Sequence, residues 1–153
     1  MDSSREKQVQ LDTLLPLICE QLDRGDHVKF FPRGVSMLPM LRQGRDAVIL
    51  SPVTGKLRRF DLPFYRRENG QFVLHRIIRV GQTYTCMGDN QFEEEPGVAH
   101  EQVIAVVTAF TRNGKLWQVT DPRYRLYCRL WYHSRHIRRF WRRGWGWLRR
   151  HLG

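Results

Sequence analysis

Apolar residues recur at helical spacing near the start of the chain. Within residues 8–24 they stand three or four positions apart and predict an amphipathic helix: Leu11, Leu14, Leu15, Ile18 and Leu22. Gly25 is a natural stop for such a helix. Pro16 lies inside the pattern and predicts a late start or a kink. We therefore expect an N-terminal helical segment over residues 1–26.

Between residues 27 and 122 the pattern changes to short runs of β-branched and aromatic residues, separated by clusters of Gly, Asn, Asp and Ser. The Asn69-Gly70 pair predicts a hairpin that joins Phe64–Arg67 to Gln71–Ile78. Many short strands at this spacing favour a mostly β fold of coiled antiparallel sheets, or a partial barrel, over a parallel α/β fold. The runs that we predict as strands are His27–Phe31, Ala47–Leu50, Leu62–Tyr65, Phe72–Val80, Thr83–Met87, Gln102–Phe110 and Leu116–Val119.

Helical spacing returns in residues 123–153. An apolar stripe continues through the segment, and Arg occupies much of the remainder; four of the five Trp residues lie here. Gly144 and Gly146 would interrupt the helix. The stripe consists of Leu126, Leu130, Ile137, Trp141, Trp145, Leu148 and Leu152, and the four Trp are Trp131, Trp141, Trp145 and Trp147.

The charge divides the chain at the same place. The formal net charge is +11, yet residues 1–122 hold 16 basic and 15 acidic side chains, while residues 123–153 hold ten Arg and no acid. A nucleic-acid-binding domain would more often build its basic face into the fold. We therefore expect a β catalytic domain over residues 27–122 and a cationic amphipathic tail over 123–153.

An Arg-rich helix backed by Trp and Leu is typical of a segment that lies in a membrane interface. Each basic side chain near an anionic leaflet adds about 1 kcal/mol, so the tail would hold the protein at an anionic membrane surface. Two alternatives stay open: the stripe docks on the β domain or on a protein partner, or Arg and Trp bind nucleic acid, which the charge distribution disfavours.

The remaining composition places the protein in the cytosol, peripheral at the inner membrane face. No apolar run approaches the roughly 18–20 residues that cross a bilayer, and the N-terminus has no secretory-signal pattern. The three cysteines, Cys19, Cys86 and Cys128, are widely spaced and read as free thiols. His133 and His136 would share a helix face, but we expect them on the polar surface, and we predict no metal and no cofactor.

Three local patterns have the chemistry of a catalytic site. Ser36 lies in a turn bounded by Gly and Pro within Gly34-Val35-Ser36-Met37-Leu38-Pro39, which Gly44-Arg45-Asp46 follows. A serine hydroxyl needs a base to act as a nucleophile, and His75 in Leu74-His75-Arg76 has a suitable ordinary pKa, about 6.5. Asp89 in Gly88-Asp89-Asn90 would fix the imidazole tautomer through a hydrogen bond. Each pattern alone also fits a turn, a structural histidine or a hairpin.

Together, in this order and at these separations, the three patterns resemble the boxes of the signal peptidase I family from about residue 28 to residue 110. His75 stands where the bacterial type carries Lys, so the chain resembles the Ser-His form of the archaeal and endoplasmic-reticulum type. The resemblance implies a mostly β fold of the signal-peptidase type and endopeptidase activity after small residues in an extended substrate.

The resemblance also implies roles for individual residues. Ser36 would be the nucleophile, His75 the base and Asp89 the orienting acid. The backbone N–H of Ser36 would stabilise the oxyanion, and Met37 and Pro39 would shape the substrate cleft. Gly34 has no hydroxyl to serve as a second oxyanion donor.

Two features depart from the family. Residues 8–24 are too polar to replace its N-terminal transmembrane anchor. Downstream of Asp89, where the histidine type often has another Asp, the chain reads Glu93-Glu94-Glu95-Pro96. Either one of these glutamates substitutes or Asp89 acts alone; we expect the acidic run to be a solvated loop.

The sequence thus predicts a Ser-His serine endopeptidase of signal-peptidase type, acting on peptide or precursor-protein substrates at a membrane surface. The alternative is a non-catalytic peptide-binding or membrane-adaptor protein on the same scaffold, consistent with the loss of the anchor. A self-cleaving repressor is disfavoured because such proteins pair Ser with Lys and add a DNA-binding domain, for which 27 residues are too few. The oligomeric state and the cleavage motif stay undetermined.

Overall fold

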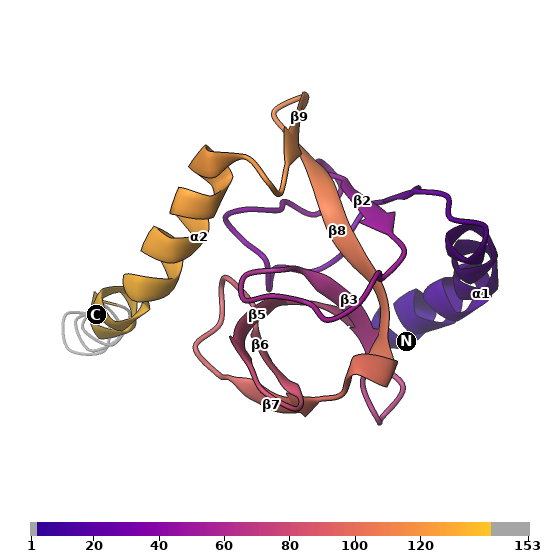
Figure 1. Ribbon diagram of the computed structural model, residues 1–153, viewed down its shortest axis with the longest axis horizontal. Helices are drawn as coiled ribbons and strands as arrows, with labels where there is room; N and C mark the ends of the chain where they lie inside the picture. Colours follow the sequence, from indigo (N-terminus) through magenta and orange to yellow (C-terminus); the bar gives the residue numbers. More distant parts are fainter. Residues whose placement is uncertain (1–2, 142–153) are drawn as a thin grey trace.

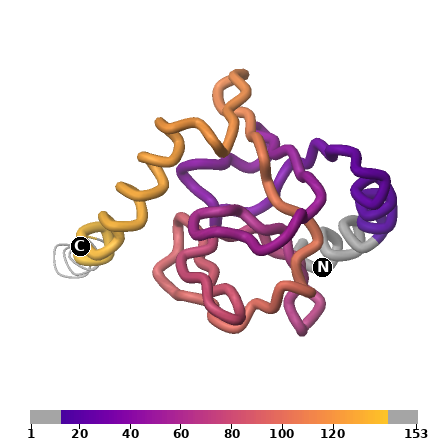
Figure 2. The backbone as a smooth tube through the Cα atoms, in the orientation of Figure 1, coloured from indigo at the N-terminus to yellow at the C-terminus, as the bar shows by residue number. Residues whose placement is uncertain are grey.

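The computed structural model describes the backbone of residues 3–141 and the side chains of residues 13–141. A β-sheet body lies between two helices, α1 (Ser3–Asp23) and α2 (Pro122–His133), which extend to opposite sides of it (Figure 1). The tube in Figure 2 shows the same path, with the chain crossing the body several times between the helices. None of the described helices combines the length and apolar character that crossing a bilayer requires.

Two antiparallel sheets form the body. The six-stranded sheet has the order β1-β2-β8-β3-β4, and β9 pairs with β8 outside this path; the three-stranded sheet has the order β5-β6-β7. The predicted mostly β fold with antiparallel sheets is confirmed, and the pairings of the described strands do not close a barrel. The strands are β1 (Val28–Phe30), β2 (Val48–Ser51), β3 (Pro63–Arg66), β4 (Phe72–Leu74), β5 (Arg76–Val80), β6 (Tyr84–Met87), β7 (Glu95–Val98), β8 (Val103–Arg112) and β9 (Lys115–Gln118); a short 3₁₀ turn spans His100–Gln102.

The predicted N-terminal helix is present, but it begins at Ser3 and continues through Pro16. Its C-terminus is fixed by a pair of backbone bonds: the N–H of Gly25 donates to Leu22 and that of Asp26 donates to Gln21, at 2.9 Å each. This is the Schellman arrangement, which needs a residue with positive φ. Gly25, at φ +84°, supplies it.

The predicted Asn69-Gly70 hairpin is confirmed as the β3–β4 pair. The prediction of one continuous strand over Phe72–Val80 is wrong, because the chain leaves the six-stranded sheet after Leu74 and enters the three-stranded sheet at Arg76. His75 is the single residue between them. The regular alternation of faces, which placed His75 beside Val73 and Ile77, does not extend across such a crossover.

The acidic run is only partly the solvated loop that we predict. Glu95 begins β7 and pairs with Cys86 of β6. Pro96 and Gly97 are typical of a turn, so the sequence pattern does not predict this strand. β7 is an edge strand of its sheet, where Pro is tolerated.

Both helices contribute to the main core. Ile18 and Leu22 of α1 and Tyr124 and Cys128 of α2 are buried in it; the rest of the cluster includes Met37, Met40, Leu41, Val48, Leu50, Leu62, Phe64, Leu74, Ala105, Val107 and Phe110. A second cluster lies against the three-stranded sheet, around Tyr65, Ile77, Tyr84 and Cys86. α2 is therefore part of the packed body.

The junction between body and tail is well defined. Asp121 caps α2 by accepting a hydrogen bond from the N–H of Arg123 at 2.8 Å, and Pro122 occupies the first turn. A further helical stretch covers residues 135–141. The predicted stripe residues Trp145, Leu148 and Leu152, together with Trp147, lie outside the described residues.

Candidate active site

Ser36 and His75 line the same groove. Its volume is about 700 Å³, and its wall includes residues from α1, β1, β3 and β4. Met37, predicted to shape the cleft, also lines it, whereas Pro39 does not. No hydrogen bond joins Ser36 and His75 in the described chain; proton transfer requires them to approach to about 2.6–3.2 Å, and such bonds often tighten only when substrate binds.

The Ser36 turn is held by its own backbone and by its anchors in the core. The N–H of Leu38 donates to Val35 at 3.2 Å and that of Leu41 to Met37 at 3.0 Å. The side chains of Met37 and Leu41 are buried in the main core. Among the described residues the N–H of Ser36 has no acceptor. This N–H is therefore left without an internal acceptor in the part of the chain that the structure describes.

The Gly88-Asp89-Asn90 segment contacts the Ser36 turn directly. The N–H of Asn90 donates to the carbonyl oxygen of Ser36 at 2.8 Å, and the Asn90 side-chain amide donates to that of Val35 at 3.1 Å. A Cβ at position 88 would lie 2.7 Å from the Ser36 carbonyl oxygen and 2.8 Å from Oε1 of Gln91. Only glycine fits here. The first and third sequence patterns thus meet through their backbones.

The Gly44-Arg45-Asp46 segment anchors the other end of the turn. Asp46 is buried and accepts hydrogen bonds from the guanidinium groups of Arg42 and Arg112. The hydrogen bonds from Arg42 lower the pKa of Asp46 to about 2. Arg112 also donates to the carbonyl oxygens of Pro39 and Met40 at 2.6 Å and 3.0 Å. Pro39 therefore belongs to the support of the turn and not to the groove.

His75 is buried at the crossover between the sheets, with the ring of Tyr65 edge-on at a centroid distance of 6.5 Å. Its Nδ1 has no hydrogen-bond partner among the described residues, and Oε2 of Glu95 lies 3.7 Å from it. Burial lowers the pKa of His75 to about 4, although the charge of Glu95 acts to raise it. The imidazole is therefore neutral at pH 7, which is the protonation state that a general base requires.

Glu95 is held beside His75 by two other side chains. Arg67 donates to both of its carboxylate oxygens, at 2.6 Å and 2.7 Å, and the hydroxyl of Tyr65 donates to Oε2 at 2.7 Å. The hydrogen bonds from Arg67 hold the pKa of Glu95 below its ordinary value. A fixed carboxylate thus lies beside Nδ1 of His75. This residue is one of the three glutamates that the sequence left as alternatives.

Asp89 does not have the predicted position relative to His75. Both of its carboxylate oxygens accept hydrogen bonds from Arg76 at 2.7 Å, and Tyr127 of α2 donates to one of them at 3.2 Å. The predicted hydrogen bond between Asp89 and His75 is absent from the described structure. The physical reason is that His75 and Arg76 point to different clusters, and the buried guanidinium occupies the carboxylate.

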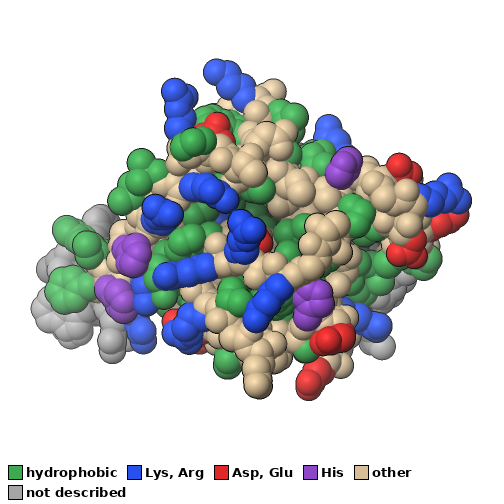
Figure 3. All heavy atoms as spheres, viewed as in Figure 1, with side chains coloured by type: hydrophobic (Ala, Val, Ile, Leu, Met, Phe, Trp, Pro, Cys, Tyr) green, Lys and Arg blue, Asp and Glu red, His purple; other side chains and the backbone are tan. Residues whose placement is uncertain are grey.

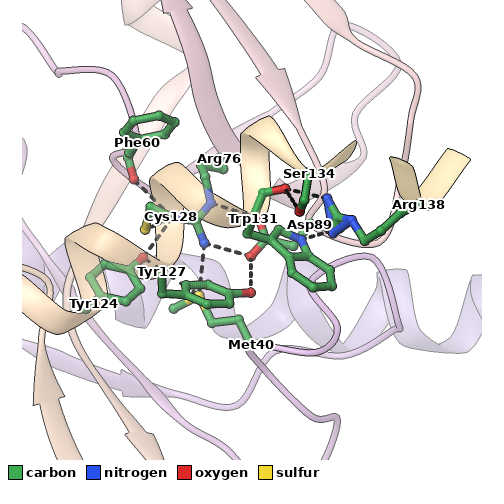
Figure 4. Close-up of polar contacts among 10 residues, drawn as sticks. All are labelled: Met40, Phe60, Arg76, Asp89, Tyr124, Tyr127, Cys128, Trp131, Ser134 and Arg138. Atoms are coloured by element: carbon green, nitrogen blue, oxygen red, sulfur yellow. Dashed lines mark hydrogen bonds and ion pairs between the residues drawn. The ribbon is translucent and has the colours of Figure 1, made fainter. Parts of the chain in front are cut away.

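The Arg76–Asp89 pair is the centre of a polar cluster shared with α2 (Figure 4). Arg76 also donates to the hydroxyl of Tyr124 at 2.8 Å and to the carbonyl of Phe60 at 3.3 Å, and its remaining contacts are the sulfur atoms of Cys128 and Met40. Burial alone would lower the pKa of Arg76, but Asp89 together with Tyr124 and Cys128 holds that pKa above its ordinary value.

The same cluster connects α2 to the Ser36 turn. The indole N–H of Trp131 donates to the carbonyl oxygen of Asp89 at 2.8 Å, and the N–H of the same peptide bond, that of Asn90, donates to the carbonyl oxygen of Ser36. Arg138 stacks on the Trp131 ring, with its guanidinium carbon 3.4 Å from the ring centroid. Asp89 therefore positions the Ser36 turn through its backbone.

A second Ser–His pair is formed by His27, just before β1, and Ser51, the last residue of β2. Nδ1 of His27 lies 2.7 Å from Oγ of Ser51, which is itself 2.7 Å from Oγ1 of Thr108. Ser51 is buried, and none of these residues lines the groove. His27 and Thr108 therefore satisfy the buried hydroxyl of Ser51.

Comparison with family models, with curated proteins and with solved structures gave no match to this chain. The described residues contain no group of three or more His, Cys, Asp and Glu side chains placed to hold a metal ion. The groups available for chemistry at the groove are the hydroxyl of Ser36, the neutral buried imidazole of His75 and the carboxylate of Glu95 beside that imidazole.

Proposed function

We propose that the protein is a serine endopeptidase of signal-peptidase type, which cleaves extended peptides by a Ser-His mechanism. The observation that supports it most is that Ser36 and His75, 39 positions apart in the chain, line one groove. A neutral imidazole with a carboxylate 3.7 Å from its Nδ1 has the arrangement of a general base whose cationic form is stabilised by an anion.

In the proposed reaction, Oγ of Ser36 bonds to the scissile carbonyl carbon while its proton passes to Nε2 of His75. The carbonyl electron pair moves onto the oxygen, which accepts a hydrogen bond from the Ser36 N–H; one such donor contributes about 2.7–4 kcal/mol in comparable sites. The C–N bond then breaks as the imidazolium protonates the leaving amine. Water hydrolyses the acyl-enzyme by the same route, and Glu95 stabilises the imidazolium in both steps.

The strand order supports an extended substrate. Among the described strands β1 pairs only with β2 and β4 only with β3, so both are edge strands, and residues of both line the groove. Unpaired backbone groups on an edge strand bind a peptide in β conformation. A peptide bound in this way would pass Ser36 with its scissile bond exposed.

The direct test is cleavage of an extended peptide library by three variants. Ser36→Ala and His75→Ala are expected to reduce kcat/KM at least a thousandfold, because each removes a reacting group. Ser51→Ala is expected to retain near-normal kcat/KM, since Ser51 belongs to the second Ser–His pair outside the groove. Cleavage that survives Ser36→Ala, or is lost only in Ser51→Ala, would overturn the proposal.

A second candidate function is peptide binding without cleavage, as an adaptor on the same scaffold. The observation that favours it is the missing hydrogen bond between Ser36 and His75 among the described residues. It predicts that wild-type protein binds groove peptides with a measurable Kd but releases them uncut. Turnover that depends on Ser36 excludes this candidate.

We also propose that the tail associates with an anionic membrane surface. One face of α2 is buried against the body, whereas the predicted stripe residues Leu126, Leu130, Ile137 and Trp141 are 56–63% exposed. Hydrophobic side chains are visible at the α2 end of the face in Figure 3. The alternative in which this stripe packs on the body is disfavoured by these exposures.

Liposome flotation tests this association. Full-length protein is expected to float with phosphatidylglycerol vesicles and to stay at the bottom with purely phosphatidylcholine vesicles. Leu130→Glu with Ile137→Glu should abolish flotation, because it places charge on the exposed stripe. Equal flotation of this variant and wild type would contradict the proposal.

A further inference from the structure

The groove beside Ser36 has an aromatic floor. Phe30 of β1, Phe64 of β3 and Phe72 of β4 form a row, with ring centroids 5.4 Å and 6.0 Å apart. Phe64 is buried, while Phe30 and Phe72 are half-buried and line the groove. The buried side chains of Leu41 and Leu74 extend the same wall. A substrate side chain as small as that of Ala would leave most of this apolar surface uncovered.

The rim of the groove is cationic. Lys29 and Arg33 line it, both are exposed, and both lie on the segment that leads into the Ser36 turn. Nζ of Lys29 lies 5.4 Å from the ring centroid of Phe31, and neither cation has an ion pair with a described side chain. Arg67 also lines the groove, but Glu95 neutralises it.

No acidic residue appears among the described side chains that line the groove. The positive charges of Lys29 and Arg33 therefore have no negative counter-charge within the groove lining. The chain's own Arg-rich segment, residues 123–153, carries ten positive charges and no negative charge, so it would be repelled from this rim. An acidic group would complement the charge of this rim.

We infer that the substrate is an extended peptide in which a bulky apolar side chain lies next to an acidic one. The inference rests on the proposed endopeptidase function. The apolar side chain would cover the Phe30–Phe64–Phe72 row, and the carboxylate would lie between Lys29 and Arg33. The two edge strands that border the groove favour a peptide over an anionic lipid, because an acyl chain makes no use of their backbone groups. This preference differs from the small residues that the sequence resemblance implies.

The experiment measures kcat/KM for a matched set of fluorogenic peptides. One position is Phe or Ala and its neighbour is Glu, Gln or Lys, with the remaining sequence fixed. Wild type is expected to favour Phe over Ala about tenfold and Glu over Lys about tenfold, the latter less at high salt. In the double variant Lys29→Glu, Arg33→Glu the order of Glu and Lys should reverse, while the preference for Phe stays.

The matched control is Arg58→Glu with Lys115→Glu, which changes the net charge equally at exposed positions outside the groove lining. It should keep the wild-type order. Equal charge preferences in wild type, the groove variant and the control would overturn the inference, as would a preference for Ala over Phe. If no peptide is cleaved faster by wild type than by Ser36→Ala, the proposed endopeptidase function fails instead. Binding of anionic vesicles that competes with peptide cleavage would assign the rim to lipid and also overturn the inference.

Discussion

His75 and Arg76 are neighbours in the chain, yet their side chains lie in two polar clusters of opposite character. Every nitrogen of the Arg76 guanidinium has a partner, and its carboxylate partner Asp89 is also fully engaged. His75 has a buried Nδ1 without a hydrogen bond and a carboxylate 3.7 Å from that atom. The first cluster fixes structure, and the second retains a group that can take up a proton.

The crossover between the two sheets explains why these neighbouring side chains lie in different clusters. Because the chain passes from the six-stranded to the three-stranded sheet at this point, consecutive side chains reach opposite surroundings. Arg76 is fixed by α2, and the Asp89–Asn90 peptide transmits that support to Ser36. Buried polar groups without partners are costly, so native proteins retain few of them, and each calls for an explanation. The proton transfer that we propose would explain why His75 keeps such a group.

The largest expected effect is on stability, from Arg76→Met. The substitution would leave the Asp89 carboxylate buried without its cation, which costs about 3–5 kcal/mol of the free energy of unfolding. Arg79→Met is the matched control on the same strand, because Arg79 pairs with Glu94 at the surface and such pairs contribute about 0–1 kcal/mol. Urea unfolding measures both; equal losses would break the distinction between the two clusters.

A smaller effect, on catalysis, is expected from Glu95→Gln. Removing the anion that faces the imidazolium should lower kcat/KM about 10- to 100-fold, less than where such a carboxylate is directly hydrogen-bonded. Burial lowers the pKa of His75 to about 4, and the charge of Glu95 acts to raise it. Without that charge, the fall of kcat/KM at acid pH should move to still lower pH in the variant. The free-enzyme pKa is read from kcat/KM against pH.

Glu94→Gln is the control for this variant, because Glu94 has no contact with His75 and pairs with Arg79. Its pH profile should overlay that of the wild type. An acid limb that shifts equally in both variants would show that Glu95 has no special relation to the imidazole. Urea unfolding of both variants separates this effect from a loss of folded protein, since Glu95 also holds Arg67.

Much of the arrangement follows from local sequence. The alternation of apolar residues and the Asn69-Gly70 turn predict the antiparallel strands and the β3–β4 hairpin, and Gly25 predicts the end of α1. The Ser36 turn and His75 can be recognised in the sequence, because a serine between Gly and Pro and a histidine within a strand-like run are both local patterns. Their common groove depends on pairings between distant strands, which local patterns do not encode.

The local sequence does not determine which carboxylate lies beside His75. Asp89 has the sequence position of an orienting acid, but only the fold decides whether it faces His75 or Arg76. The sequence does not distinguish Glu95 from Glu93 and Glu94, and the Pro96-Gly97 pair after it is typical of a turn, although the chain forms an edge strand there. Tyr65 and Arg67, which hold Glu95, lie about 30 residues earlier in the chain, and Tyr65 belongs to the other sheet, so their contacts with Glu95 arise where the two sheets meet.

The most direct measurement of the central claim is covalent labelling of the nucleophile. A fluorophosphonate probe is incubated with wild type, His75→Ala and Ser51→Ala at pH 7, and the labelled residue is identified by peptide mass spectrometry. We predict a single adduct on Ser36, formed at similar rates in wild type and Ser51→Ala and lost in His75→Ala. An adduct on Ser51, or labelling of Ser36 that is unchanged without the imidazole, would contradict the account.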